Sequence, residues 1–165
     1  MTRVLAVAIL LGASVALPAE AQTRPPVQPP RITPTSPQLE ERDLPVTADD
    51  VAILVRAESL LSDTSVWNRT DERECKDDEA TGKRSLFCAL QRACIDVLGS
   101  YDHRRVALQE VRFAVEDATR GKNFEHRLRD FNNLPTTQLE DIKRVLAVAR
   151  ERVTARLKAK KSGDA

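Results

Sequence analysis

Apolar residues recur at the three- and four-residue spacing of an α-helix in several stretches of this 165-residue chain. The clearest stretch is 85–99, where Ser85 is a suitable N-cap and Gly99 is a suitable residue to follow the last turn. Apolar and polar residues nowhere alternate over a length that would suit a strand. The pattern therefore predicts an all-α fold, a small bundle of about five helices.

The 85–99 helix has a wide apolar face, which predicts a position in the middle of the bundle. The residues expected on this face are Leu86, Leu90, Ala93, Cys94 and Val97. Cys94 is therefore expected to be a buried small hydrophobe. Cys88 and Ile95 fall outside the face, and Cys88 lies in the first turn, where the helix dipole favours a thiolate.

Two further helices are predicted over 47–61 and 102–121, each from an N-cap and an apolar stripe. Thr47 caps the first helix, and its buried positions are expected to be Val51, Leu54, Val55 and Leu61. Asp102 caps the second helix and Gly121 ends it, with a stripe formed by Leu108, Val111, Ala114, Val115 and Ala118.

The last part of the domain is predicted to contain a short helix and a long one. The short helix covers 123–131 and directs Phe124, Leu128 and Phe131 inward. The long helix begins at a capping box formed by Thr137 and Glu140. Its apolar stripe consists of Leu139, Ile142, Leu146, Ala149, Val153 and Leu157.

Residues 1–21 have the three parts of a signal peptide. Arg3 supplies the positive charge, Val4–Leu17 is the apolar core, and Ala19-Glu20-Ala21 is a cleavage site with small residues. The apolar core is shorter than the roughly 20 residues that a membrane-spanning helix needs. The sequence therefore predicts export to the periplasm or the medium and no transmembrane segment in the mature chain.

The remainder divides into three segments. Residues 22–46 are rich in proline, which favours extended polyproline II and predicts a disordered linker. The helical domain is assigned to 47–158, and 159–165 form a polar C-terminal tail.

Charge and motifs exclude several classes of function. The chain has 26 basic and 25 acidic residues, a net charge of +1, which argues against a globally basic nucleic-acid-binding protein. The cysteines and histidines lack the spacing of a metal site, so we expect none. Since no glycine-rich phosphate loop is present either, we expect no cofactor.

The three cysteines predict one disulfide, because export would place them in an oxidising compartment. Cys88 and Cys94 diverge on one helix and cannot easily bond to each other, so Cys75 must take part in any intrachain bridge. The Cys75–Cys88 pair is preferred, since the loop from Cys75 returns to the start of that helix. The alternative is Cys75–Cys94, which would leave Cys88 as a free thiol.

Several short motifs resemble a bacterial and phage family, the domain of unknown function 6197. They are Trp67, an acidic turn closing at Gly82, Phe87-Cys88 at a helix start, and His126 followed by Phe131-Asn132. The resemblance covers about Ala52–Val153. The chain departs from the family at two places, with Cys88-Ala-Leu-Gln-Arg for Cys-x-x-Gly-Ala and Asn132-Asn133 for Asn-Asp. The resemblance implies a fold and a set of positions, but no reaction.

One set of residues could support chemistry: Cys88, His126, and Asn132 or Asn133. A cysteine hydrolase or transferase needs a thiolate, an imidazole and a polar group that orients the imidazole. The same positions would have structural roles if Cys88 forms a disulfide and the asparagines cap a helix end. We therefore prefer a non-enzymatic binding module with a protein or other envelope partner. The thiol enzyme and a purely structural envelope protein are the alternatives.

Overall fold

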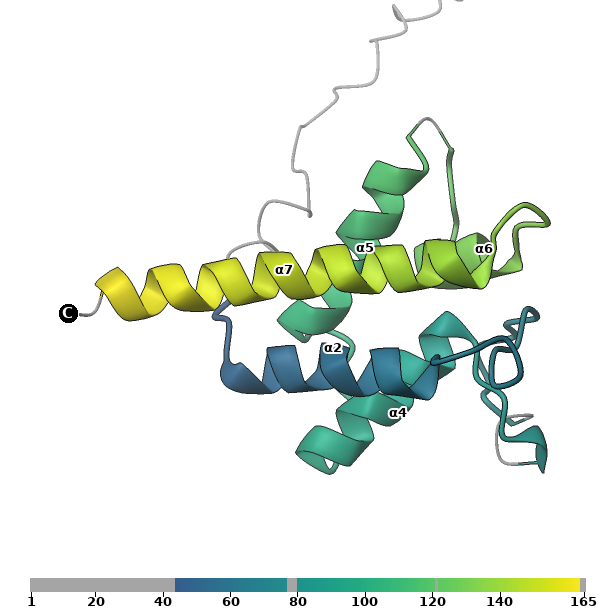
Figure 1. The fold of residues 1–165 in the computed structure, drawn as a ribbon, viewed down its shortest axis with the longest axis horizontal. Coiled ribbons are helices and arrows are strands. Elements are labelled where there is room, and N and C mark those ends of the chain that lie inside the picture. The colour runs from purple at the N-terminus through teal and green to yellow at the C-terminus, as the bar shows by residue number, and fades with distance from the viewer. Residues whose placement is uncertain (1–43, 77–79, 121, 164–165) are drawn as a thin grey trace, which may run out of the picture. The chain divides into compact units, whose positions relative to one another are not determined.

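The computed structural model describes residues 44–76, 80–120 and 122–163, and these form five α-helices (Figure 1). The helices are α2 (Ala48–Leu60), α4 (Leu86–Leu98), α5 (Val106–Ala118), α6 (Arg127–Asn133) and α7 (Leu139–Gly163). Within these ranges the only bridge of extended chain joins Trp67 to Arg84. The predicted all-α bundle is confirmed. The predicted signal peptide, residues 22–43 of the linker, and Gly121 lie outside the described residues.

Helices α2 and α7 run antiparallel beside each other (Figure 1). α2 also packs against α4 and α5, while α5 packs against α6 and α7. An ion pair of 2.9 Å between Arg150 and Glu58 joins α7 to α2. The expectation that α4 lies in the middle is wrong. Its main neighbours are α2 and α6, whereas α2 and α5 each pack against three other helices and are therefore more central.

Most residues expected in the core are buried. All six residues of the predicted α7 stripe contribute, although Leu157 is only partly buried. Two predictions are wrong: Val55 is 51% exposed, and Ala118 is exposed at the end of α5. Val55 points outward because α2 directs Ile53 and Ala57, on its opposite side, toward its neighbours.

The start of α2 agrees with the prediction. Thr47 precedes the helix, and its backbone N–H donates to Asp50 Oδ2 at 2.9 Å. Asp50 is completely buried, and its other oxygen accepts from the backbone N–H of Ala107 at 3.2 Å. Arg105 lies 3.1 Å from Asp50 Oδ2. The carboxylate of Asp50 therefore connects the starts of α2 and α5.

Two predicted helix starts are wrong. α5 begins at Val106, and Asp102 instead accepts a hydrogen bond from the backbone N–H of Arg104 in the preceding loop. α7 begins at Leu139 without the Thr137–Glu140 capping box. The hydroxyl of Thr137 donates to the Phe131 carbonyl instead, and the backbone N–H of Gln138 donates to Asp141. Both errors arise because a polar residue near a helix start has several backbone partners to choose from.

The short helix α6 is displaced from its predicted position. It covers Arg127–Asn133, so Phe124 lies in the loop before it and is only partly buried. Leu128 and Phe131 are buried as expected.

The folded part extends beyond the assigned boundaries at both ends. Val46, assigned to the linker, is 5% exposed, and Leu44 packs against the core. At the other end α7 continues to Gly163, although its residues from Lys158 onward are exposed. No helix of the described part is both long and apolar enough to cross a membrane.

Candidate functional site

A disulfide joins Cys75 to Cys88, with 5.5 Å between their Cα atoms. This is the pairing preferred from the sequence. Cys88 is in the first turn of α4 and is 5% exposed, so it is buried under the loop that carries Cys75. Cys94 is a free thiol, fully buried, and burial raises its pKa. The oxidised protein therefore has no accessible thiolate at either helical cysteine.

Asn132 is fully buried and connects three segments of the chain. Its Oδ1 accepts hydrogen bonds from the indole N–H of Trp67 at 2.9 Å and from the backbone N–H of Leu86 at 3.1 Å. Its Nδ2 donates to the carbonyl of Asn68 at 3.1 Å. Since these bonds occupy the amide, Asn132 holds the 67–71 loop and the start of α4 rather than orienting an imidazole.

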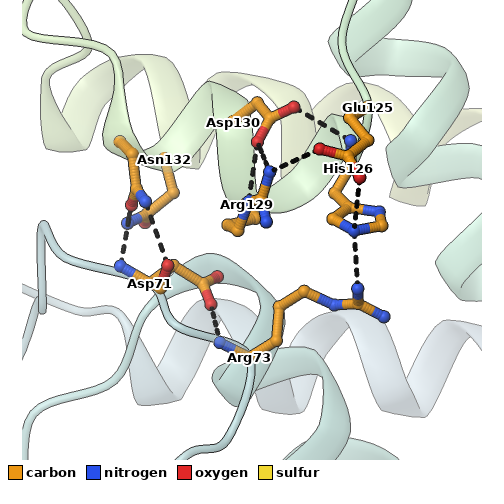
Figure 2. Close-up of polar contacts among 8 residues, drawn as sticks. Asp71, Arg73, Glu125, His126, Arg129, Asp130 and Asn132 are labelled. Atoms are coloured by element: carbon orange, nitrogen blue, oxygen red, sulfur yellow. Dashed lines mark hydrogen bonds and ion pairs between the residues drawn. The ribbon is translucent and has the colours of Figure 1, made fainter. Parts of the chain in front are cut away.

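The neighbouring Asn133 binds the same loop. Its Oδ1 accepts from the backbone N–H of Asp71 at 2.7 Å, and its Nδ2 donates to the Asp71 carbonyl at 3.0 Å. The side chain of Asp71 in turn accepts from the backbone N–H of Arg73 at 2.7 Å (Figure 2). The loop is therefore fixed at Asp71 on one side of Arg73 and at the disulfide of Cys75 on the other.

Arg73 is held in an unusual backbone conformation between these two attachments. Its φ is 65° and that of Cys75 is 56°, values in the left-handed region that residues other than glycine seldom adopt. The guanidinium of Arg73 lies 2.8 Å from Nε2 of His126 (Figure 2). It also lies 5.9 Å from the ring centroid of Phe87. The attachments of the loop therefore direct this cation toward α6 and α4.

His126 is positioned by the residues around the start of α6. Its backbone N–H donates to Asp130 at 2.9 Å, and Arg129 pairs with Asp130 at 2.7 Å and with Glu125 at 3.5 Å (Figure 2). Although burial alone would raise it, the pKa of Asp130 is lowered by the hydrogen bonds from His126 and Arg129. Nε2 of His126 thus lies between the guanidinium of Arg73 at 2.8 Å and Oε1 of Glu125 at 3.7 Å.

These residues border a cleft of about 460 Å³, which we call the arginine cleft. Its basic side chains come from the loop before α4, the loop before α5, α5 itself and the α6 region, and they are Arg73, His103, Arg112, His126, Arg127 and Arg129. Its apolar wall consists of Phe87, Phe124 and Leu128. Among the described residues, Glu125 is the only carboxylate residue that lines it, so this lining has a net positive charge.

The three residues proposed for catalysis do not form one site. His126 lines the arginine cleft, whereas Cys88 and Cys75 border a separate small pocket. The sequence reasoning missed all four arginines of the cleft. Arg127 and Arg129 on either side of the inward-facing Leu128 were a local signal, but nothing near Arg73 or Arg112 indicates that they meet there.

Among the described side chains, no group of three or more His, Cys, Asp or Glu residues is placed to hold a metal ion. Comparison with known proteins gives one match: residues 45–152 fit the model of a family of unknown function (DUF6197). This confirms the resemblance seen in the sequence. No curated protein and no solved structure matches the chain.

Proposed function

Because this chain belongs to a family of unknown function (DUF6197), we propose its function from its own geometry: it is an exported binding module of the cell envelope that holds a small ligand non-covalently in the arginine cleft. The observation that carries the proposal is the cleft itself. A volume of about 460 Å³ lies within the range of roughly 300–1,000 Å³ that is usual for small-molecule sites. The signal-peptide pattern of residues 1–21 supports export.

The side chains of the cleft are held in place before any ligand arrives. Asp130 fixes Arg129 and His126, and the disulfide and Asp71 fix the loop that bears Arg73. Such preorganisation lowers the entropy lost on binding. Thiol catalysis at Cys88 would require reduction of the disulfide and a different position for the imidazole, so a binding role is the simpler use of this arrangement.

The proposal is tested by nuclear magnetic resonance with a fragment library that contains acidic, basic and neutral compounds. We expect the amide shifts caused by binding to cluster at Phe87, Phe124 and Leu128. Phe124→Ala should weaken the fragments that bind, because Phe124 is a partly buried wall of the cleft. Val55→Ala removes apolar atoms at an exposed site and serves as the control. Shifts scattered over the surface, or equal binding by both variants, would contradict the proposal.

A further inference from the structure

Three arginines of the arginine cleft differ in how described carboxylates balance their charge. Arg127 lies 3.3 Å from Glu116, and Arg129 pairs with Asp130 and Glu125. Arg73 makes no ion pair with a carboxylate in the described ranges, and its guanidinium contacts a ring nitrogen of His126 and the ring of Phe87. No described carboxylate therefore balances the charge of Arg73, and an anionic ligand suits this side of the cleft better than a cationic one.

The geometry of a guanidinium indicates which anions suit it. The planar group presents parallel N–H donors that match the two oxygens of a carboxylate or a phosphate. Arg73 is exposed on the side of the loop that faces the cleft and holds its position through His126 (Figure 2). A ligand oxygen can approach its remaining N–H groups without displacing a carboxylate of the described residues.

The apolar wall of the arginine cleft sets a second requirement for the ligand. Phe87, Phe124 and Leu128 present apolar surface to the cleft, and the ring of Phe87 is held edge-on against Tyr101 with 6.1 Å between centroids. A small inorganic anion would fill little of the 460 Å³ and would leave this wall in contact with water.

We infer that the ligand of the arginine cleft is a small amphiphilic anion, whose acidic group pairs with Arg73 and whose apolar body packs against Phe87, Phe124 and Leu128. This inference rests on the proposed function and names the chemical class of its ligand. A carboxylate or phosphate joined to a flat ring and one joined to an acyl chain share this chemistry.

The test measures the affinity of the oxidised protein for four probes by titration calorimetry. They are 2-naphthoate, its neutral analogue 2-naphthamide, decanoate and inorganic phosphate. We expect 2-naphthoate or decanoate to bind, with 2-naphthamide and phosphate at least about tenfold weaker. The ratio of 2-naphthoate to decanoate distinguishes a ring from a chain. The inference would be overturned if 2-naphthoate and 2-naphthamide bound with equal affinity. It would also be overturned if inorganic phosphate were the only probe that bound.

Two variants locate the effect. Arg73→Gln should weaken 2-naphthoate at least about tenfold while leaving 2-naphthamide unchanged. Arg104→Gln removes the same charge from an exposed residue outside the cleft and should change neither affinity. Melting curves of both glutamine variants verify folding. A third variant, Arg73→Lys, keeps the charge without the planar donors. If both glutamine variants bind 2-naphthoate equally, the assignment to Arg73 is wrong.

The fragment screen separates this inference from the proposed function. Acidic fragments that shift the backbone amide signals of the cleft residues would support both the proposed function and the ligand class. Neutral or basic fragments that bind there more tightly than acids would overturn the ligand class and leave the binding module in place. An absence of cleft shifts from every fragment would overturn the binding module itself.

Discussion

The indole N–H of Trp67 donates to the side-chain oxygen of Asn132 at 2.9 Å, across 65 positions of the sequence. Both side chains are buried, and the same oxygen accepts from the backbone N–H of Leu86. One amide thus holds the loop after α2, the first turn of α4 and the end of α6 together.

Asn132→Ala should be strongly destabilising, because it leaves the N–H groups of Trp67 and Leu86 buried without a partner. Each such group costs about 1–3 kcal/mol. We expect the free energy of unfolding, measured by urea denaturation, to fall by at least about 2 kcal/mol. Asn123→Ala, at an exposed loop position, should change it by less than about 0.5 kcal/mol. Similar values for the two variants would show that the contacts of Asn132 do not matter for stability.

Removing the disulfide should affect both stability and the arginine cleft. The bridge closes a loop with a sequence separation of 13, and the chain-entropy model assigns about 3 kcal/mol to a loop of this size. Cys75→Ala with Cys88→Ala should therefore lower the melting temperature. It should also weaken 2-naphthoate binding, because the left-handed residues Arg73 and Cys75 can then relax.

The double variant also provides its own control, since a reductant should lower the melting temperature of the wild type but not that of the variant.

Peptide mapping after iodoacetamide treatment identifies which cysteines are free and reactive. In the unreduced native protein we expect no alkylation at Cys88, which is bridged, or at Cys94, which is buried with a raised pKa. Rapid alkylation of Cys88 would favour the thiol-enzyme alternative.

Leu146 tests the packing of α7. Its side chain is fully buried in the middle of the apolar stripe of α7, so Leu146→Ala should cost about 2–5 kcal/mol. Val55→Ala, at a position that is 51% exposed, should cost less than about 0.5 kcal/mol. Chemical denaturation of both variants measures the loss of unfolding free energy at a buried position of α7 and at an exposed position of α2. A reversal of this order would mean that the helices pack through other faces.

Asp130 should contribute to the acid sensitivity of the protein. Its pKa is lowered in the folded state from a reference value of 3.8. Its contribution to stability is therefore fully present above pH 3.8 and is lost as the pH falls through the folded value. Asp130→Asn should be less stable than the wild type at neutral pH, and the difference should shrink only as the pH falls below 3.8.

Unfolding curves from pH 7 to about pH 2 measure this difference. Asp49→Asn is the control, because the side chain of Asp49 is exposed and makes no hydrogen bond or ion pair with a described residue. Its difference from the wild type should stay within about 0.5 kcal/mol throughout. A constant difference for Asp130→Asn would contradict the proposed linkage.

Processing of the N-terminus remains a prediction from the sequence. Cleavage after Ala21 would leave Gln22 as the first residue, and intact-mass measurement of exported protein checks this. Limited proteolysis should then remove most of the proline-rich linker but stop before Leu44, which packs against the core. A full-length chain in the membrane fraction would rule out cleavage.

The helices could be predicted from the sequence because their causes are local. The stripe from Leu139 to Val153 repeats at the helical period, and Ser85 and Gly99 cap α4 as expected. The preferred disulfide partner of Cys75 could also be inferred, because the direction of side chains on one helix separates Cys88 from Cys94. The predicted helix starts were wrong where a polar side chain has several possible backbone partners nearby, as at Asp102 and Thr137.

The arginine cleft could not be predicted in the same way. Arg73 meets His126 across 53 positions, and Asn132 meets Trp67 across 65. Nothing in the neighbourhood of these residues marks them as partners, because their meeting depends on how α4, α5 and α6 pack. The same packing turns Val55 outward and buries Ile53. Turn angle and capping chemistry act within a few residues and specify the helices, whereas a site built from distant side chains exists only once the helices are packed.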